Sequence, residues 1–167
     1  MKSSNRFALL ATVVVALSSL SSVAMAASVS GTANANVLAP MTITAGTALN
    51  FGTFTPNATG GTVVIATGGG RSFTGTVLGT AATTISAATF NVTGTGSAGF
   101  AISVPGTFNV TRTGFTETMA VVVNVASATG TLSGGTASFP VGGTLTVGAG
   151  QVAGAYSGSY SMTVEYN

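Results

Sequence analysis

The chain has 167 residues and is rich in Gly, Ala, Thr, Ser and Val, with no Cys, His or Trp and only 4% charged residues. Residues 27–167 have a formal net charge of zero, because their only charged residues are Arg71, Arg112, Glu117 and Glu165. Two arginines cannot form the basic surface that nucleic-acid binding requires. The absence of His, Cys and Asp likewise excludes a zinc or calcium site of the usual kind, so we expect no metal and no cofactor.

The same composition argues against an enzyme. General acid–base catalysis needs a group whose pKa can be set near the working pH, and the many Ser and Thr hydroxyls have no base to activate them. Glu117 and Glu165 could act together only if the fold brought them into a carboxylate pair, whereas single acids on alternating strands are usually solvated. We therefore expect no catalytic residue.

Residues 1–26 have the features of a secretory signal peptide. Lys2 and Arg6 precede an apolar stretch at 7–17, and Ala24, Met25 and Ala26 form a small-x-small cleavage site. A membrane anchor is the competing interpretation, but serines at 18, 19, 21 and 22 interrupt the roughly 20 apolar residues that an anchor needs. We expect cleavage after Ala26, export to the periplasm and then the cell surface, and no integral membrane segment in the mature protein.

Residues 27–40 are expected to be an N-terminal extension. Small apolar residues alternate there with Ser, Thr and Asn, which is typical of a strand with one apolar face. Pro40 marks the end of this segment. The alternating apolar positions are Val29, Gly31, Ala33, Ala35 and Val37.

From residue 41 onward the hydrophobic period remains two, and Gly, Pro, Asn and Ser clusters separate short strands. This pattern predicts one all-β domain over 41–167, an antiparallel immunoglobulin-like β-sandwich that a donor strand could complete. Valines at 121–123 and 125 predict a strand buried on both faces. The expected strands are 41–45, 49–54, 62–66, 71–78, 88–93, 100–104, 107–111, 116–127, 137–147 and 156–166.

One stretch matches a dinucleotide-binding motif formally. Residues 94–99 read G-x-G-x-x-G, but the motif binds a pyrophosphate only where a helix begins directly after it. Residues 100–104 predict a strand instead, so we interpret this stretch as the loop of a glycine-rich hairpin.

The last predicted strand is the most regular. Its alternate residues from Tyr156 to Tyr166 are apolar or aromatic, and the residues between them are Ser, Thr and Glu. This segment resembles the last strand of pilins assembled by the chaperone–usher route, with Tyr166 penultimate and Gly154 fourteenth from the end. The resemblance implies that this strand contacts an assembly chaperone or a neighbouring subunit through Gly154, Tyr156, Tyr160, Met162, Val164 and Tyr166.

The segment Leu-Asn-Phe-Gly-Thr-Phe at 49–54 is also similar to a family of bacterial exported domains of unknown function, related to spore-coat-U-like and Mat-type fimbrial subunits. This resemblance implies a structural subunit of a pilus or fimbria-like polymer. Its expected partners are like subunits, a periplasmic chaperone and an outer-membrane usher. In that mechanism residues 28–37 would be a donor strand that completes a neighbouring subunit.

Two alternatives remain open from the sequence. Residues 28–37 could form the first strand of their own domain. The protein could also be a monomeric exported β-sandwich that binds carbohydrate or mediates surface adhesion, although the absence of Trp is unusual for a sugar-binding surface.

Overall fold

The computed structural model describes residues 25–75, 77–80 and 83–167. The chain divides into two units, Met1–Ala35 and Asn36–Asn167. In the first unit, residues 25–35 contain no strand or helix and every one of them is exposed. The basic and apolar parts of the predicted signal peptide lie outside the described residues.

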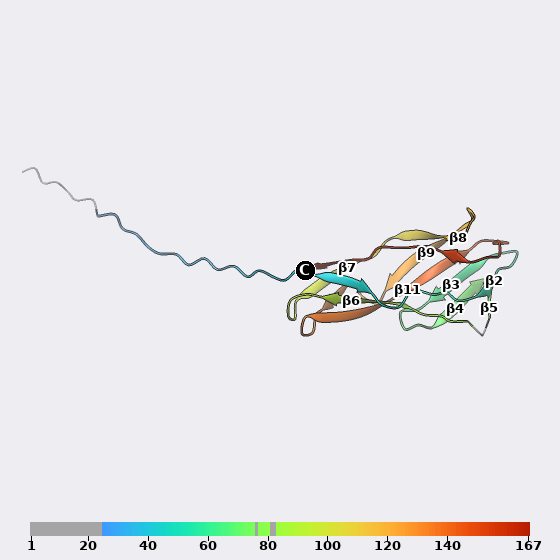
Figure 1. The fold of residues 1–167 in the computed structure, drawn as a ribbon, viewed down its shortest axis with the longest axis horizontal. Helices are drawn as coiled ribbons and strands as arrows, with labels where there is room; N and C mark the ends of the chain where they lie inside the picture. The colour runs from blue at the N-terminus through green and yellow to red at the C-terminus, as the bar shows by residue number, and fades with distance from the viewer. Residues whose placement is uncertain (1–24, 76, 81–82) are drawn as a thin grey trace, which may run out of the picture. The chain divides into compact units, whose positions relative to one another are not determined.

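The second unit is built from short β-strands, and the described residues contain no helix (Figure 1). Gly, Pro, Asn or Ser residues lie between most consecutive strands, as the sequence pattern predicts. The strands are β1 (Thr42–Ala45), β2 (Phe54–Thr55), β3 (Gly61–Ile65), β4 (Arg71–Gly75), β5 (Leu78–Gly79), β6 (Ala88–Thr93), β7 (Gly99–Ser103), β8 (Thr107–Arg112), β9 (Thr118–Val125), β10 (Thr129–Thr131), β11 (Thr136–Val147), β12 (Tyr156–Ser157) and β13 (Thr163–Tyr166).

All the strand pairs of the described residues are antiparallel. The main sheet has the order β1-β6-β11-β9-β8-β12, and the hairpin β3-β4 joins it through β11. Smaller sheets are formed by β10-β7-β13 and by β2-β5. The 12-residue strand β11 organises the main sheet, since its first half pairs with β6 and its second half with β9 and β3. The predicted all-β antiparallel sandwich is therefore confirmed.

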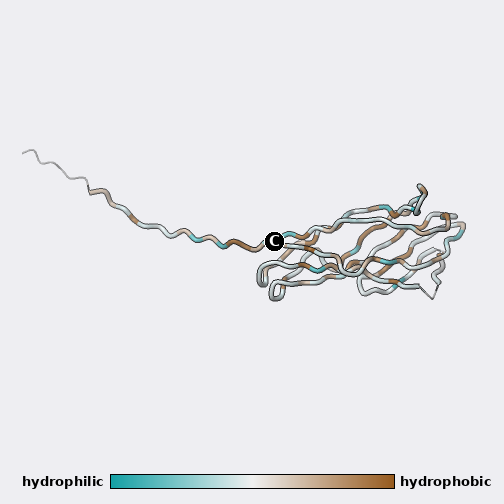
Figure 2. The backbone as a smooth tube through the Cα atoms, in the orientation of Figure 1, coloured by the Kyte–Doolittle hydropathy of each residue, from teal (hydrophilic) through white to brown (hydrophobic). Residues whose placement is uncertain are grey.

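The core consists of two apolar clusters. The first contains side chains from both the main sheet and the β10-β7-β13 sheet, including Val92, Phe100 and Val141. The second lies under the other half of the main sheet, around Val63, Val121 and Leu145. Much of the brown, hydrophobic colour of Figure 2 lies on the strands of the sandwich, and much of the remaining chain is near white.

The second layer of the sandwich differs between the two clusters. A three-stranded sheet covers the first cluster, against which Leu49 also packs. Short β2 and the irregular chain around Phe51 lie against the second cluster. Phe51 and Phe54 pack there as partly buried residues. Half of the main sheet is thus covered by irregular chain and a two-residue strand, and this is where the groove described below lies.

Parts of the strand prediction need correction. Val122 is 42% exposed while Val121 and Val123 are buried, so β9 buries one face and not two. The glycine-rich stretch 94–99 is a loop, but it connects β6 to β7, which belong to different sheets, so it is not a hairpin. The pattern also gave no indication of β10, whose three residues are too few to show a period.

The first strand of the sandwich is β1, which begins at Thr42. Residues 25–41 have no strand assignment. Within this structure, residues 28–37 are therefore not a strand of their own domain.

Candidate functional site

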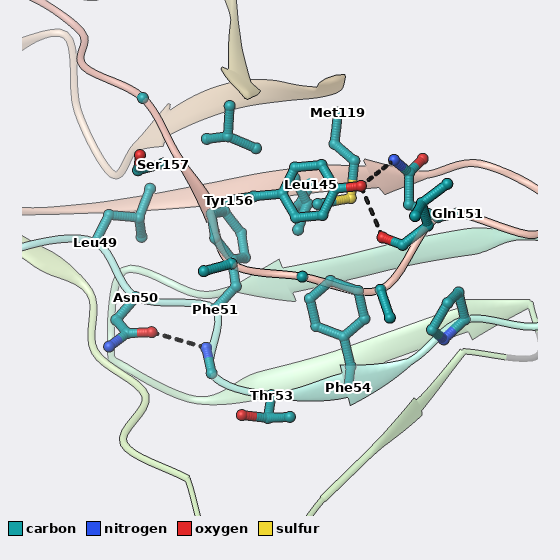
Figure 3. A pocket seen from close by; sticks show the side chains of 18 of the residues that line it. Leu49, Asn50, Phe51, Thr53, Phe54, Met119, Leu145, Gln151, Tyr156 and Ser157 are labelled. Carbon is teal, nitrogen blue, oxygen red and sulfur yellow. Dashed lines mark hydrogen bonds between the residues drawn. The ribbon is translucent and has the colours of Figure 1, made fainter. Parts of the chain in front are cut away.

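An open groove of about 640 Å³ lies over the second core cluster (Figure 3). One wall is formed by residues 49–54 together with Pro56, and the other by residues 151–158. The floor and one end are apolar, since they are formed by Phe108, Val110, Met119, Leu145 and Tyr160. None of the described residues that line it is charged.

The first wall is the segment Leu49–Phe54, which the sequence predicts as a strand. Most of it is not one: Asn50 forms an isolated bridge with Ser86, and only Phe54 enters β2. The Asn50 side chain accepts a hydrogen bond from the Gly52 backbone N–H at 2.9 Å, in an Asx turn. Gly52 has a φ of 71°, a conformation that favours glycine. The wall is therefore a shaped turn and not a regular edge strand.

The second wall is the chain that leads into the C-terminal strand. The Tyr156 hydroxyl donates a hydrogen bond to the Val152 carbonyl and accepts one from the Gln151 amide, both at 2.8 Å (Figure 3). At Gly154 a Cβ would approach Arg112 Nε to 2.6 Å, so the arginine side chain occupies the space that any other residue would need. These contacts hold the wall against β8.

The two walls are not paired with each other. Among the described residues, no hydrogen bond joins 49–56 to 151–158; the nearest link is Gly150 N–H to the Asn57 carbonyl, beyond one end. Strand β12 pairs with β8 on one side, and no strand of the described part of the chain pairs with its other side. The groove therefore combines an apolar floor with a sheet edge that has no strand beside it.

The structure divides the predicted C-terminal contact residues into two groups. Gly154, Tyr156 and Tyr160 line the groove. Met162 is buried in the first core cluster, and Val164 and Tyr166 pack against it as partly buried residues.

The C-terminal strand is also not continuous, contrary to the sequence expectation. Tyr156 and Ser157 pair with β8, whereas Thr163–Tyr166 pair with β7 in the other sheet. A Cβ at Gly158 would come within 2.5 Å of the Asn109 carbonyl oxygen, so this glycine lets the chain cross close to β8 as it changes sheet.

The Tyr166 hydroxyl connects the last strand to the chain that leads into β1. It donates to the Ala39 carbonyl at 2.9 Å and accepts from the Thr95 N–H at 2.7 Å. The Ala39 N–H in turn donates to the Thr95 hydroxyl at 2.7 Å. Both backbone groups of Ala39 are thus held, just before Pro40 and β1.

The predicted donor residues are all exposed. Val29 is 98% exposed and Val37 is 89% exposed, and the remaining positions Gly31, Ala33 and Ala35 are exposed as well. Val29 and Val37 are the largest apolar residues of the predicted donor face.

The two acidic residues have different surroundings. Glu117 forms an ion pair with Arg112 at 3.3 Å in the turn between β8 and β9, while Glu165 is an exposed residue of β13. In the part of the chain that the structure describes, no three His, Cys, Asp or Glu residues gather as a metal site would require. Within the same described part, no helix has the length and apolar character needed to cross a membrane.

Sequence reasoning found one wall of the groove and missed the role of the other. The sequence predicts the segment at 49–54 as a strand and as a motif of resemblance, but it gives that segment no place in a site. For Arg71, which contacts that segment, the sequence predicts only the start of a strand and one of the four charged residues of 27–167. Its isolation in a nearly uncharged chain is the signal that could have drawn attention to it.

Comparisons with known proteins gave one result. Searches of curated proteins and of solved structures found no significant match. A family model described as a domain of unknown function, DUF4402, matches residues 41–166. The match covers the whole sandwich from just before β1 to the end of β13, and the chain belongs to this family.

Proposed function

We propose that this protein is a structural subunit of a pilus or fimbria-like surface polymer, in which residues 28–37 of one copy fill the groove of the next. The observation that carries the proposal is a groove whose two walls are not paired with each other, in a chain that also has an exposed alternating segment. An extended segment added at a sheet edge gains backbone hydrogen bonds from the edge and places alternate side chains in the groove.

The groove and the segment match chemically. The floor residues are aliphatic or aromatic, and the inward face of the segment is Val, Gly or Ala throughout. Burying each valine contributes about 1.5–3 kcal/mol. Each new backbone hydrogen bond contributes roughly 0.5–1.5 kcal/mol net, so the backbone supplies much of the affinity and the two valines supply the register.

A free subunit with this groove exposes apolar surface and an unpaired edge, both of which promote aggregation. We propose that a periplasmic chaperone covers the groove during transit, and that an outer-membrane usher receives the subunit. The groove-lining residues Gly154, Tyr156 and Tyr160 are the expected contacts on the C-terminal strand.

The test replaces Val29 and Val37 with Asp in the exported chain. Two charges would then have to enter the apolar groove, where an unpaired charge is strongly unfavourable. We expect size-exclusion chromatography to show loss of polymers while the circular dichroism spectrum of the sandwich is retained. The matched control is Ser30→Asp with Asn36→Asp, which adds the same charge to the outward face and should still polymerise.

A peptide of residues 28–37 provides the complementary measurement. Added to the Val29→Asp/Val37→Asp chain, it should raise the melting temperature increasingly with concentration, by an amount equivalent to about 2.7 kcal/mol at one hundred times its Kd. A chain that is monomeric without the substitutions, and whose melting temperature ignores the peptide, would contradict the proposal.

The second candidate function is a monomeric binding module. The groove's aromatic residues Phe51, Phe54, Tyr156 and Tyr160 favour it, because aromatic faces suit carbohydrate or other amphipathic ligands. A monomer at all concentrations that binds such a ligand, and loses it on Phe54→Ala, would replace the polymer proposal.

A further inference from the structure

Arg71 lies on the edge strand β4 and reaches across to the groove wall. Its Nη1 donates hydrogen bonds to the carbonyls of Phe51 at 3.0 Å and Thr53 at 3.2 Å. The same nitrogen lies 3.3 Å from the Thr83 hydroxyl, and Nη2 donates to the Thr80 carbonyl at 2.9 Å. Four acceptors from two separate segments thus converge on one guanidinium.

The charge of Arg71 is not used for an ion pair. The described residues give it no carboxylate partner, and its guanidinium carbon lies 4.9 Å from the centre of the Phe73 ring. The guanidinium presents five donors in a planar fork, whereas a lysine is a compact point charge that cannot reach several separated acceptors at once. The site therefore uses the shape of arginine, not only its charge.

Two glycines make room for this side chain. A Cβ at Gly52 would approach Arg71 Nη1 to 2.5 Å. A Cβ at Gly79 would collide first with the Phe73 ring and would also approach Arg71 Nη2 to 2.9 Å. Gly52 is the glycine of the 49–54 segment, so the motif and Arg71 fit each other. The wall that contains Leu49, Phe51 and Phe54 is anchored from behind by a residue that does not itself line the groove.

We propose that Arg71 is the positioning residue of the groove: it holds the 49–54 wall in place and thereby sets how tightly the groove retains an inserted strand. Phe51 and Thr53, whose carbonyls it binds, alternate with Gly52 and Phe54 along the wall, so releasing them frees the whole turn. This inference rests on the proposed function for its ligand, which is a strand from a second copy. The conformational stability of the 49–54 wall can be measured without that ligand.

The experiment uses the full Val29→Asp/Val37→Asp chain, whose groove has no competing donor, and a fluorescent peptide of residues 28–37. Arg71→Met keeps most of the side-chain stem and removes every donor, while Arg71→Lys keeps the charge. Val92→Ala is the matched control, since Val92 is fully buried in the first core cluster, away from the groove. Peptide Kd, dissociation rate, melting temperature and hydrogen exchange of the 49–54 amides are measured for each.

We expect Arg71→Met to raise the peptide Kd at least tenfold, mainly through faster dissociation, and Arg71→Lys to give an intermediate value. Val92→Ala should lower the melting temperature at least as much as Arg71→Met does. Its peptide Kd should stay within twofold of the parent value. Equal Kd values for Arg71→Met and its parent, or an equal effect of Val92→Ala, would overturn the inference.

Hydrogen exchange separates this inference from the proposed function. If the parent chain binds no peptide, the strand-exchange proposal fails. Exchange that becomes at least tenfold faster at 49–54 in Arg71→Met, and not in Val92→Ala, would still support Arg71 as the residue that positions the wall. Exchange that rises uniformly over the sandwich would overturn that role too.

Discussion

Tyr160 lies at the junction between the two core clusters. Its ring stacks on Phe108 with centroids 5.0 Å apart and meets Phe90 edge-on at 6.1 Å. Phe90 and Phe108 are the aromatic residues of two identical Thr-Phe-Asn-Val-Thr segments on β6 and β8. The repeat thus supplies two similar apolar surfaces that one tyrosine covers, which is a structural role for it and not a sign of a repeat protein.

Tyr160 also makes stability depend on pH. Burial raises the pKa of its hydroxyl above the ordinary value of 10.0, so the folded state disfavours the phenolate. The stabilising difference is fully present below the unfolded-state pKa of about 10 and is lost as pH rises through the folded pKa. We expect the unfolding free energy from urea denaturation to fall as the pH rises above about 10. The unfolding free energy of Tyr160→Phe should fall less over the same pH range.

Two variants separate the ring from the hydroxyl. Tyr160→Ala should destabilise by about 3 kcal/mol, the low end for buried aromatic truncations, because the ring is only partly buried. Tyr160→Phe should change the unfolding free energy at neutral pH by less than about 0.5 kcal/mol, since the described residues give its hydroxyl no hydrogen bond. A large loss in Tyr160→Phe would show that the hydroxyl, not the ring, is what matters.

At the scale of elements, the alternating pattern predicted most strands and failed where tertiary contacts decide. Strand β6 matches its expected bounds of 88–93. The equally regular segment 156–166 is divided, because the chain changes from one sheet to the other beside β8 at Gly158. A hydrophobic period of two indicates which side chains of a strand face the core. It does not indicate which of the two sheets contains the strand that pairs with it.

The groove could be predicted only in part for the same reason. Tyr156 and Tyr160 belong to the alternating pattern of the last strand, and the resemblance to pilins added Gly154 and implied that this strand is a contact strand. The opposite wall depends on the Asn50–Ser86 bridge and on Arg71, which are distant in sequence. Such contacts form only in the folded protein, and they do not produce a periodic pattern in the sequence.

The two ends of the C-terminal segment give a matched pair of variants. Tyr166→Phe removes the hydroxyl that bridges Ala39 and Thr95, and Tyr156→Phe removes the one that bridges Val152 and Gln151. Each should cost about 1 kcal/mol, the net contribution typical of hydrogen bonds whose partners can turn to water when the hydroxyl is removed. Hydrogen exchange should increase at residue 39 and at Thr95 only in Tyr166→Phe, and near 151–152 only in Tyr156→Phe. Increases at both sites in both variants would contradict this division.

At the scale of the whole molecule, the proposed interface joins two different surfaces, an extension and a groove. A contact between unlike surfaces does not close on itself unless a rotation happens to form a ring, so it generates open chains. Ten extended residues reach roughly 33 Å, about the length of a long strand in a neighbour. The near absence of charge over residues 27–167 also leaves little repulsion between copies.

This polarity leads to a quantitative expectation for mixed subunits. A Val29→Asp/Val37→Asp copy keeps its groove but cannot donate, so it should accept one neighbour and end the chain there. When it is co-refolded with unsubstituted subunits at a fixed total concentration, the mean chain length should fall as its fraction rises, to about ten subunits when one copy in ten is substituted, because each open chain then carries one such end. Ser30→Asp/Asn36→Asp copies, with the same added charge, should enter the chains without shortening them. Light scattering and electron microscopy measure the lengths.

Two outcomes would contradict this expectation. If both variants shorten the chains equally, the added charge and not strand donation controls assembly. If neither variant shortens them, residues 28–37 are not the strand that joins the copies.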